Sequence, residues 1–120
     1  MSKVLIVDDD KGILEVVELL LVLHDYTVKT LYSTEEILEE IESFKPDVIF
    51  LDVNLSGQDG REICKLLRTM KKAKNIPVIL FSAIPLLQES QIICGATDFL
   101  SKPFEVDELV KKIEKNLKAA

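Results

Sequence analysis

Short apolar runs alternate along the chain with longer amphipathic stretches. The runs cover residues 4–7, 27–31, 48–51, 78–81 and 99–101, and their lengths are typical of β-strands. The first, third and fourth runs are continuously apolar and rich in β-branched side chains, a composition favoured where both faces of a parallel strand are buried. The pattern therefore predicts a parallel sheet with helices packed on both of its faces.

The stretches between these runs have the periodicity of amphipathic helices. The near-apolar segment 16–23 predicts a core helix. Ser33 and Glu36 have the spacing of a capping box at a helix N-terminus. The apolar side chains that follow on one face are Ile37, Leu38, Ile41 and Phe44. The next helix has a predicted stripe of Ile63, Leu66, Leu67 and Met70. A basic run over 71–74 follows it, and we expect this run to cap the helix dipole.

Two further helices are predicted nearer the C-terminus. Pro85 suits the first turn of a short helix over 86–94, and Gly95 suits the position just past its end. The last helix opens with the acidic residues Glu105, Asp107 and Glu108 and has Leu109, Val110, Ile113 and Leu117 on its inner face. Strand and helix thus alternate five times, which predicts a doubly wound α/β fold with strand order 2-1-3-4-5. We expect residues 1–120 to form one domain, with no room for an output domain.

Charge and composition exclude several classes of protein. Lys and Arg number 15 against 21 Asp and Glu, so the net charge of −6 disfavours direct binding to nucleic acid. The start of the chain does not have the pattern of a secretory signal, and the apolar segment 16–23 is too short to span a membrane, so we expect a cytoplasmic protein. Cys64 and Cys94 form no metal or redox motif and are expected to be reduced and half-buried.

Acidic side chains follow two of the predicted strands at their carboxyl ends. The first strand ends in Asp8, Asp9 and Asp10, and the third ends in Asp52. In an open α/β sheet, ligands bind at the carboxyl edge where strand order reverses, which here lies between these two strands. Carboxylates gathered in one crevice repel one another and attract a hard divalent cation. The sequence therefore predicts a Mg²⁺ site that is completed by phosphate oxygens.

Two more polar residues are expected at the same edge. Ser82 ends the fourth strand and can donate a hydroxyl hydrogen bond, and Lys102 follows the fifth strand and supplies positive charge for an anion. An acid cluster, a hydroxyl and an ammonium group together suit phosphoryl transfer. Asp52 is the expected acceptor, because a carboxylate can attack phosphorus and form an acyl phosphate.

With these residues, the sequence resembles the receiver domains of bacterial two-component response regulators. The resemblance covers essentially the whole chain and implies a flavodoxin-like fold. Asp8 and Asp9 match the family's paired acids, Asp52 its phosphoacceptor, Ser82 its hydroxyl residue and Lys102 its lysine. The resemblance implies that Asp9 and Asp52 bind Mg²⁺ directly, Asp8 through water, and Asn54 through its backbone carbonyl. It also implies that Lys102 holds a phosphoryl oxygen and that Phe99 is an aromatic switch residue that turns inward when Ser82 moves.

The resemblance further implies the partners. The phosphoryl donor would be a histidine kinase or a histidine phosphotransfer protein, and a downstream protein target would contact the face formed by helix 4, strand 5 and helix 5. The donor histidine then lies on the partner, and we expect His24 to have only a structural role. Ile13, Leu14 and Val17 could contact a kinase helix bundle, although apolar residues of a first helix are more often core.

Three features depart from the family pattern or bear on phosphoryl lifetime. Ser56 replaces the usual proline of the loop after Asp52, which should loosen that loop. The interval from Ser82 to Lys102 is slightly short, which predicts a trimmed fourth helix or preceding loop. Ile84 offers no polar group to guide an attacking water, so we predict a long-lived phosphoryl state.

Three other functions are compatible with parts of the pattern. A phosphohydrolase with Asp52 as nucleophile would need an acid two residues later, where Asn54 stands. A flavodoxin-like binding module would need a hydroxyl- and glycine-rich phosphate loop where three aspartates stand. A degenerate receiver that acts only as a protein-interaction scaffold is the strongest alternative, although every residue needed for phosphorylation is present.

Overall fold

The computed structural model describes residues 2–55, 57–82 and 94–118 of the chain. Its main sheet consists of β1 (Lys3–Val7), β2 (Thr27–Leu31), β3 (Val48–Asp52), β6 (Val78–Ser82) and β7 (Asp98–Ser101). All neighbouring strands are parallel and the order is β2-β1-β3-β6-β7. Ranked by their place in the chain, these strands have the order 2-1-3-4-5, so the predicted topology is confirmed.

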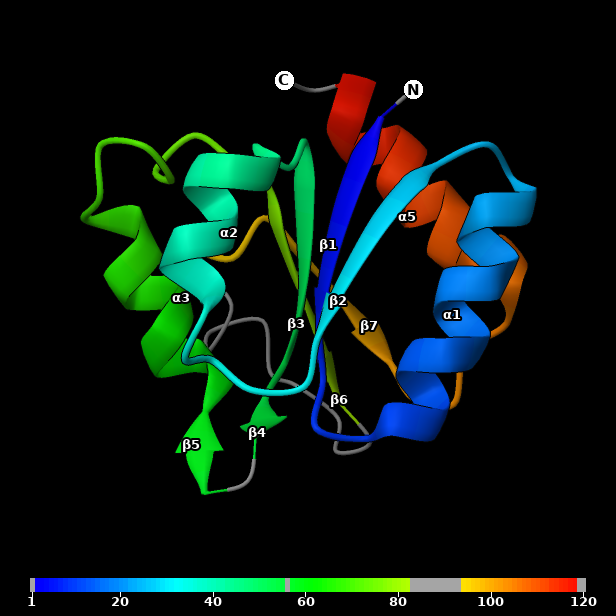
Figure 1. The fold of residues 1–120 in the computed structure, drawn as a ribbon, viewed down its shortest axis with the longest axis horizontal. Coiled ribbons are helices and arrows are strands. Elements are labelled where there is room, and N and C mark those ends of the chain that lie inside the picture. The colour runs from blue at the N-terminus through cyan, green and yellow to red at the C-terminus, as the bar shows by residue number, and fades with distance from the viewer. Residues whose placement is uncertain (1, 56, 83–93, 119–120) are drawn as a thin grey trace.

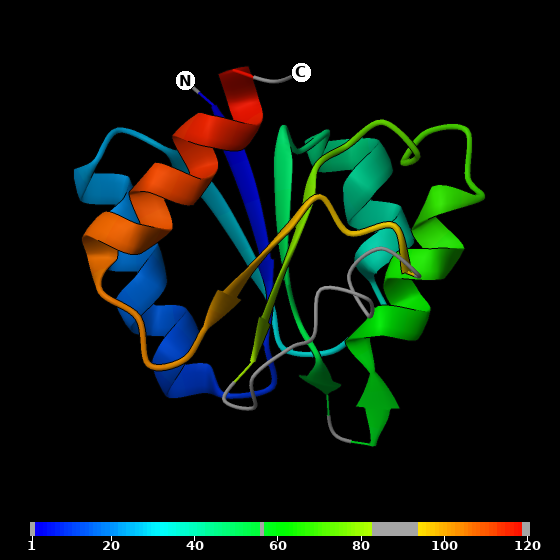
Figure 2. The ribbon, with the colours of Figure 1, turned by 180° about the vertical axis from the view of Figure 1, so that it is seen from behind.

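Helices cover both faces of the sheet. Figure 1 shows α1 (Lys11–Leu23) and α5 (Val106–Lys118) on one face, and α2 (Ile37–Phe44) and α3 (Gly60–Arg68) on the other. The reverse view in Figure 2 shows the same two layers. Alternate strand residues face opposite layers, so that Val4 and Ile6 pack toward α1 and α5 while Leu5 and Val7 pack toward α2 and α3. This alternation explains why the central strands β1, β3 and β6 are almost continuously apolar.

Four local expectations about the helices are wrong. Leu38, expected on the apolar face of its helix, is 40% exposed. The capping box at Ser33 is absent, because α2 begins only at Ile37 and Glu36 at its N-cap makes no side-chain cap hydrogen bond. Instead the Thr34 carbonyl accepts a hydrogen bond from the Ile37 N–H, and the Thr34 hydroxyl bonds to Gln58, 24 residues along the chain. The Thr34 side chain thus contacts a segment that is distant in the chain and does not cap α2.

The other two differences concern α3. Gly60, Cys64 and Leu67 face the core, so Leu66 lies outside the buried stripe and is 49% exposed. The helix ends at Arg68, and the basic residues of its last turn are Lys65 and Arg68. The run 71–74 lies beyond that end, where its charges are too far along the chain to cap the dipole in the way we expected.

Both cysteines are fully buried instead of half-buried. Cys64 on α3 is 0% exposed and Cys94 is 2% exposed, and both belong to the core between the sheet and the α2/α3 layer. Burial, together with the nearby Cys94, raises the pKa of the Cys64 thiol to about 12. The Cys64 thiol therefore stays protonated at neutral pH and packs as a small apolar group.

Most of the helix predicted over 86–94 falls outside the described residues, as do Ser56, Ile84 and Pro85. Gly95 has a φ of +79°, the left-handed conformation expected just past a helix end. Among the described residues, no helix is both long enough and apolar enough to cross a membrane.

The Arg68 side chain ties the end of α3 to two neighbouring loops. Its Nε donates to the Gly95 carbonyl at 2.7 Å, and its Nη1 donates to the Ile76 carbonyl at 2.8 Å. The carbonyls of Lys74 and Ala73 lie at 3.1 and 3.3 Å from the same Nη1. The planar guanidinium thus donates hydrogen bonds to carbonyls in the segments that precede β6 and β7.

Replacing Arg68 by lysine should lower the free energy of unfolding by about 2 kcal/mol, because a single ammonium cannot reach carbonyls on both loops. Urea unfolding of both proteins measures the difference. Arg61→Lys is the matched control, since Arg61 forms its ion pair with the nearby Asp59 at a partly exposed site, and it should cost less than about 1 kcal/mol. Equal losses in the two variants would contradict the proposed role of Arg68.

Candidate functional site

The three aspartates that follow β1 have different structural roles. Asp10 is the N-cap of α1, where its carboxylate accepts hydrogen bonds from the N–H groups of Gly12 at 2.9 Å and Ile13 at 3.2 Å. It therefore anchors the helix. Asp8 is fully buried and Asp9 is exposed, and both project from the tip of β1 toward Asp52.

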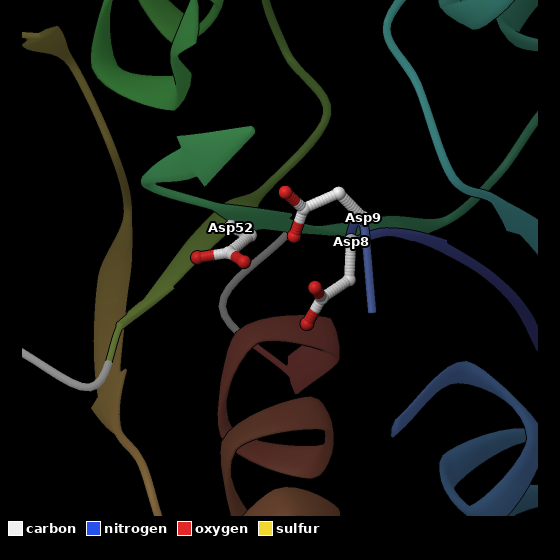
Figure 3. Close-up of side chains that lie close together, drawn as sticks. All are labelled: Asp8, Asp9 and Asp52. Carbon is white, nitrogen blue, oxygen red and sulfur yellow. The ribbon is translucent and has the colours of Figure 1, made fainter. Parts of the chain in front are cut away.

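The predicted acid cluster is present at the carboxyl edge of the sheet. Asp8, Asp9 and Asp52 each offer a carboxylate oxygen, and these oxygens lie within 4.8 Å of one another (Figure 3). Asp52 is the last residue of β3, which pairs with β1, so the parallel register brings the two strand tips together. Hard oxygen ligands in this number and spacing suit a small divalent cation such as Mg²⁺.

Lys102 bridges two of these acids. Its Nζ lies 2.8 Å from Asp8 Oδ2 and 3.2 Å from Asp52 Oδ2, although Asp8 and Lys102 are 94 residues apart. The residue follows β7, its backbone N–H donates to the Ser82 carbonyl at 2.7 Å, and its peptide bond to Pro103 is cis. Its ammonium also lies 4.7 Å from the centre of the Phe81 ring. The lysine is thus fixed from several directions.

The pKa values of Asp8 and Lys102 are both raised in this group of buried, closely spaced charges. Burial raises the pKa of Asp8 to about 6, with a further contribution from Asp52, while Lys102 and the Asp10 N–H act in the opposite direction. Burial also disfavours the charged form of Lys102, but Asp8 and Asp52 outweigh it and raise the pKa of the lysine. The site therefore holds a charged ammonium and has capacity for additional positive charge.

The structure places the other predicted residues on the expected elements. Ser82 ends β6, is 3% exposed, and pairs in register with Ser101, the residue before Lys102. Asn54 is exposed, and its N–H donates to Asp52 Oδ1 at 3.1 Å. Phe99 is half-buried on β7. The Ser82 carbonyl accepts a hydrogen bond from Lys102 and the Asn54 N–H donates to Asp52, whereas Phe99 is the second residue of β7 and precedes the carboxyl edge.

His24 caps the end of α1 and lies away from the acid cluster. Its backbone N–H donates to carbonyls of the last turn, and its ring Nδ1 lies 2.9 Å from the Leu20 carbonyl. These contacts agree with the structural role expected for it.

The sequence did not reveal a small hairpin that follows Asp52. β4 (Asn54–Leu55) and β5 (Gln58–Asp59) are antiparallel and extend past the carboxyl edge of the sheet (Figure 1). Asp59 then caps α3, and its carboxylate pairs with Arg61 at 2.8 Å. Strands of two residues have no readable periodicity, although Asp59 directly before a helix is a recognisable cap signal.

An apolar cavity of about 640 Å³ borders the acid cluster between α1 and the segment after β7. Ile13 and Val16 line it from α1, and Pro103 and Phe104 line it from the other side, with Lys102 at its edge. Leu14 and Val17 are each only 5% exposed and belong to the core. Of the three α1 residues considered for kinase contact, Ile13 and Val17 line this cavity, and Leu14 does not.

Comparison with known proteins identifies the family. A protein of Chloroflexus aurantiacus assigned as a response regulator is 36% identical, with a TM-score of 0.90 over 98% of both chains. The chemotaxis protein CheY4 of Vibrio cholerae is 31% identical, with a TM-score of 0.89 over 96% of this chain and 98% of that one. A receiver domain of a Syntrophus aciditrophicus histidine kinase is 25% identical, with a TM-score of 0.89 over 100% and 92%. Residues 4–114 match the response regulator receiver domain family, and the chain belongs to that family.

Proposed function

We propose that this receiver domain is a phosphoacceptor switch and that Asp52 receives the phosphoryl group. The supporting observation is the bridge from Lys102 to both Asp8 and Asp52, at a point where three carboxylates converge. Receiver domains are signalling switches. The carboxylate of Asp52, the ammonium of Lys102 and the acid pair of Asp8 and Asp9 support this role here.

The proposed cofactor is Mg²⁺, which would be held directly by the carboxylates of Asp9 and Asp52 and by the backbone carbonyl of Asn54, and through water by Asp8. The donor set fits, because three carboxylate oxygens within 4.8 Å of one another are the hard ligands that this ion prefers. When bound, Mg²⁺ would neutralise negative charge on the phosphoryl oxygens.

In the proposed reaction a carboxylate oxygen of Asp52 attacks the phosphorus of the donor. A new oxygen–phosphorus bond forms as the bond between phosphorus and the donor breaks, and the leaving group departs with the electron pair. Lys102 stands beside the Asp52 carboxylate and would bind a phosphoryl oxygen. The Ser82 hydroxyl would donate to another phosphoryl oxygen, and Phe99 would then move as the switch residue.

The proposed donor is a histidine kinase or a histidine phosphotransfer protein, and the proposed output is contact with a downstream protein. The apolar cavity between α1 and the segment after β7 supports donor contact there, because it lies beside Lys102. Exposed Val16, Leu19 and Leu23 extend this apolar surface along α1. Residues 1–120 form a single receiver domain in this proposal, and its cytoplasmic location remains a prediction.

Intact mass spectrometry after incubation with acetyl phosphate and Mg²⁺ tests the acceptor. Wild type should gain the mass of one phosphoryl group, Asp52→Ala should gain none, and omission of Mg²⁺ should prevent the gain. Asp107→Ala removes an exposed carboxylate from the first turn of α5 and is the control. An adduct in Asp52→Ala, or none in wild type, would overturn the proposal and favour a degenerate scaffold.

A further inference from the structure

A polar cluster next to Phe99 joins β7 to α5. Asp98 precedes Phe99 and is only 6% exposed. Its Oδ1 accepts hydrogen bonds from Lys112 Nζ and from the Phe99 N–H, both at 2.8 Å. Asn116 Nδ2 lies 3.4 Å from the other carboxylate oxygen and donates to the Lys112 carbonyl at 2.7 Å. A buried carboxylate therefore fixes the position of the Lys112 ammonium.

The charges in this cluster are stable at neutral pH. Burial opposes ionisation of Asp98, but hydrogen bonds from Lys112 and from the Phe99 N–H outweigh burial and lower the pKa of the carboxyl. The contact between Asp98 and Lys112 is therefore a charge-assisted hydrogen bond. Lys115 lies 3.5 Å from the same carboxylate, but its side chain is 72% exposed, against 29% for Lys112.

The fixed ammonium also contacts the aromatic ring. Lys112 Nζ lies 5.7 Å from the centre of the Phe99 ring, which is within the range of a cation–π interaction. The half-buried ring also packs against the core on the α2/α3 side of the sheet. Phe99 is thus held by an apolar surface and by a cation that Asp98 keeps in place.

We propose that Lys112, anchored by Asp98, is a positioning residue that holds the Phe99 ring and opposes its movement in the switch. This inference rests on the proposed function, in which Phe99 moves when Asp52 is phosphorylated. A contact made in only one of two states shifts the equilibrium toward that state. Lys112 therefore raises the threshold for activation without touching the phosphorylation site.

The size of the effect follows from the strength of the contact. A cation–π interaction at a partly exposed site corresponds to a factor of about two to five in an equilibrium constant. Lys112→Met keeps the apolar stem and removes the cation, so it should favour the moved ring by this factor. Lys112→Arg keeps a cation over the ring. Lys115→Met removes the other lysine that pairs with Asp98 and leaves the contact between Lys112 and Phe99 in place.

Two measurements on the full chain test the proposal. The first is the affinity for beryllium fluoride, a phosphoryl mimic, in the presence of Mg²⁺, because linkage between binding and conformation is reciprocal. The second is the NMR shift of the Lys112 side-chain protons next to Nζ, recorded without Mg²⁺ or beryllium fluoride. A ring close to these protons moves them upfield, and Phe99→Leu removes that shift.

The proposal expects beryllium fluoride to bind about two- to fivefold more tightly to Lys112→Met, with Lys112→Arg and Lys115→Met close to wild type. Equal affinity in wild type and Lys112→Met, or a similar gain in Lys115→Met, would overturn it. So would Lys112 protons whose shift does not respond to Phe99→Leu. If wild type bound no beryllium fluoride, the proposed function would fail. The NMR shift would then still show whether Lys112 contacts the Phe99 ring.

Discussion

Replacing Gly60 by alanine is expected to abolish phosphorylation of Asp52 and to lower the free energy of unfolding by about 3 kcal/mol. Gly60 is the first residue of α3, and its N–H donates to the Val53 carbonyl at 2.7 Å. A Cβ atom at this position would lie 2.0 Å from the Asp52 carbonyl oxygen and 2.9 Å from its carbonyl carbon. The clashing atoms are backbone, so no side-chain rotation can relieve the overlap.

Relief of that overlap would have to move the end of β3 or the start of α3. We expect the end of β3 to move, which displaces the Asp52 carboxylate from the Lys102 ammonium 3.2 Å away. Misplacement of a reacting group by about 1 Å is enough to lower a rate by about two orders of magnitude. Intact mass after treatment with acetyl phosphate measures the first effect, and urea unfolding measures the second.

Gly57→Ala is the matched control for Gly60→Ala. Gly57 has a φ of +90°, and a Cβ there would meet no atom within 4 Å. Alanine should therefore cost only about 1 to 2 kcal/mol for the left-handed backbone conformation, and Asp52 should still be phosphorylated. Normal phosphorylation of Gly60→Ala would show that the close approach to Asp52 does not matter for the site.

The sheet could be predicted from the sequence because its central strands β1, β3 and β6 are buried on both faces. The run 27–31 has the bounds of β2, and each of the other four runs differs from its strand only at the ends. The acid cluster followed from topology, since the carboxyl ends of adjacent parallel strands meet at one edge. The pattern therefore predicts that Asp8, Asp52 and Lys102 lie together, and the distances between them confirm it.

The details that sequence reasoning missed depend on contacts between distant segments. Just before α2, Thr34 bonds to Gln58 in a hairpin that has no periodic signal, and this contact could not be read from the sequence. The requirement for glycine at position 60 depends on how closely α3 approaches the Asp52 backbone. Local patterns describe a helix or a strand but not how closely two elements approach.

Lys102→Met should destabilise the Mg²⁺-free protein by about 3 kcal/mol near pH 8, because it leaves two buried carboxylates without a cation. The side chains of Asp8 and Asp52 are 0% and 6% exposed, and Lys102 bridges them. In wild type the pKa of Asp8 is about 6, and Lys102 holds it down against burial. Loss of the lysine should raise the pKa of Asp8 further and make the cost depend on pH.

The sign of that dependence follows from proton linkage. Asp8 binds its proton more tightly in the folded state, where its pKa is about 6, than in the unfolded state, where it is 3.8. Its contribution to stability is therefore largest below about pH 4 and is lost as the pH rises through 6. In Lys102→Met this loss is greater, so the difference in stability from wild type should grow between pH 4.5 and pH 8.

Urea unfolding across this pH range with EDTA present measures the difference. Lys111→Met removes an exposed lysine from α5 and should show little change at any pH. Mg²⁺ should stabilise Lys102→Met more than wild type, because a cation that binds only the folded protein raises its stability and no ammonium then competes for Asp8 and Asp52. A deficit that is equal at pH 5 and pH 8, or insensitive to Mg²⁺, would show that Lys102 does not act by neutralising these two carboxylates.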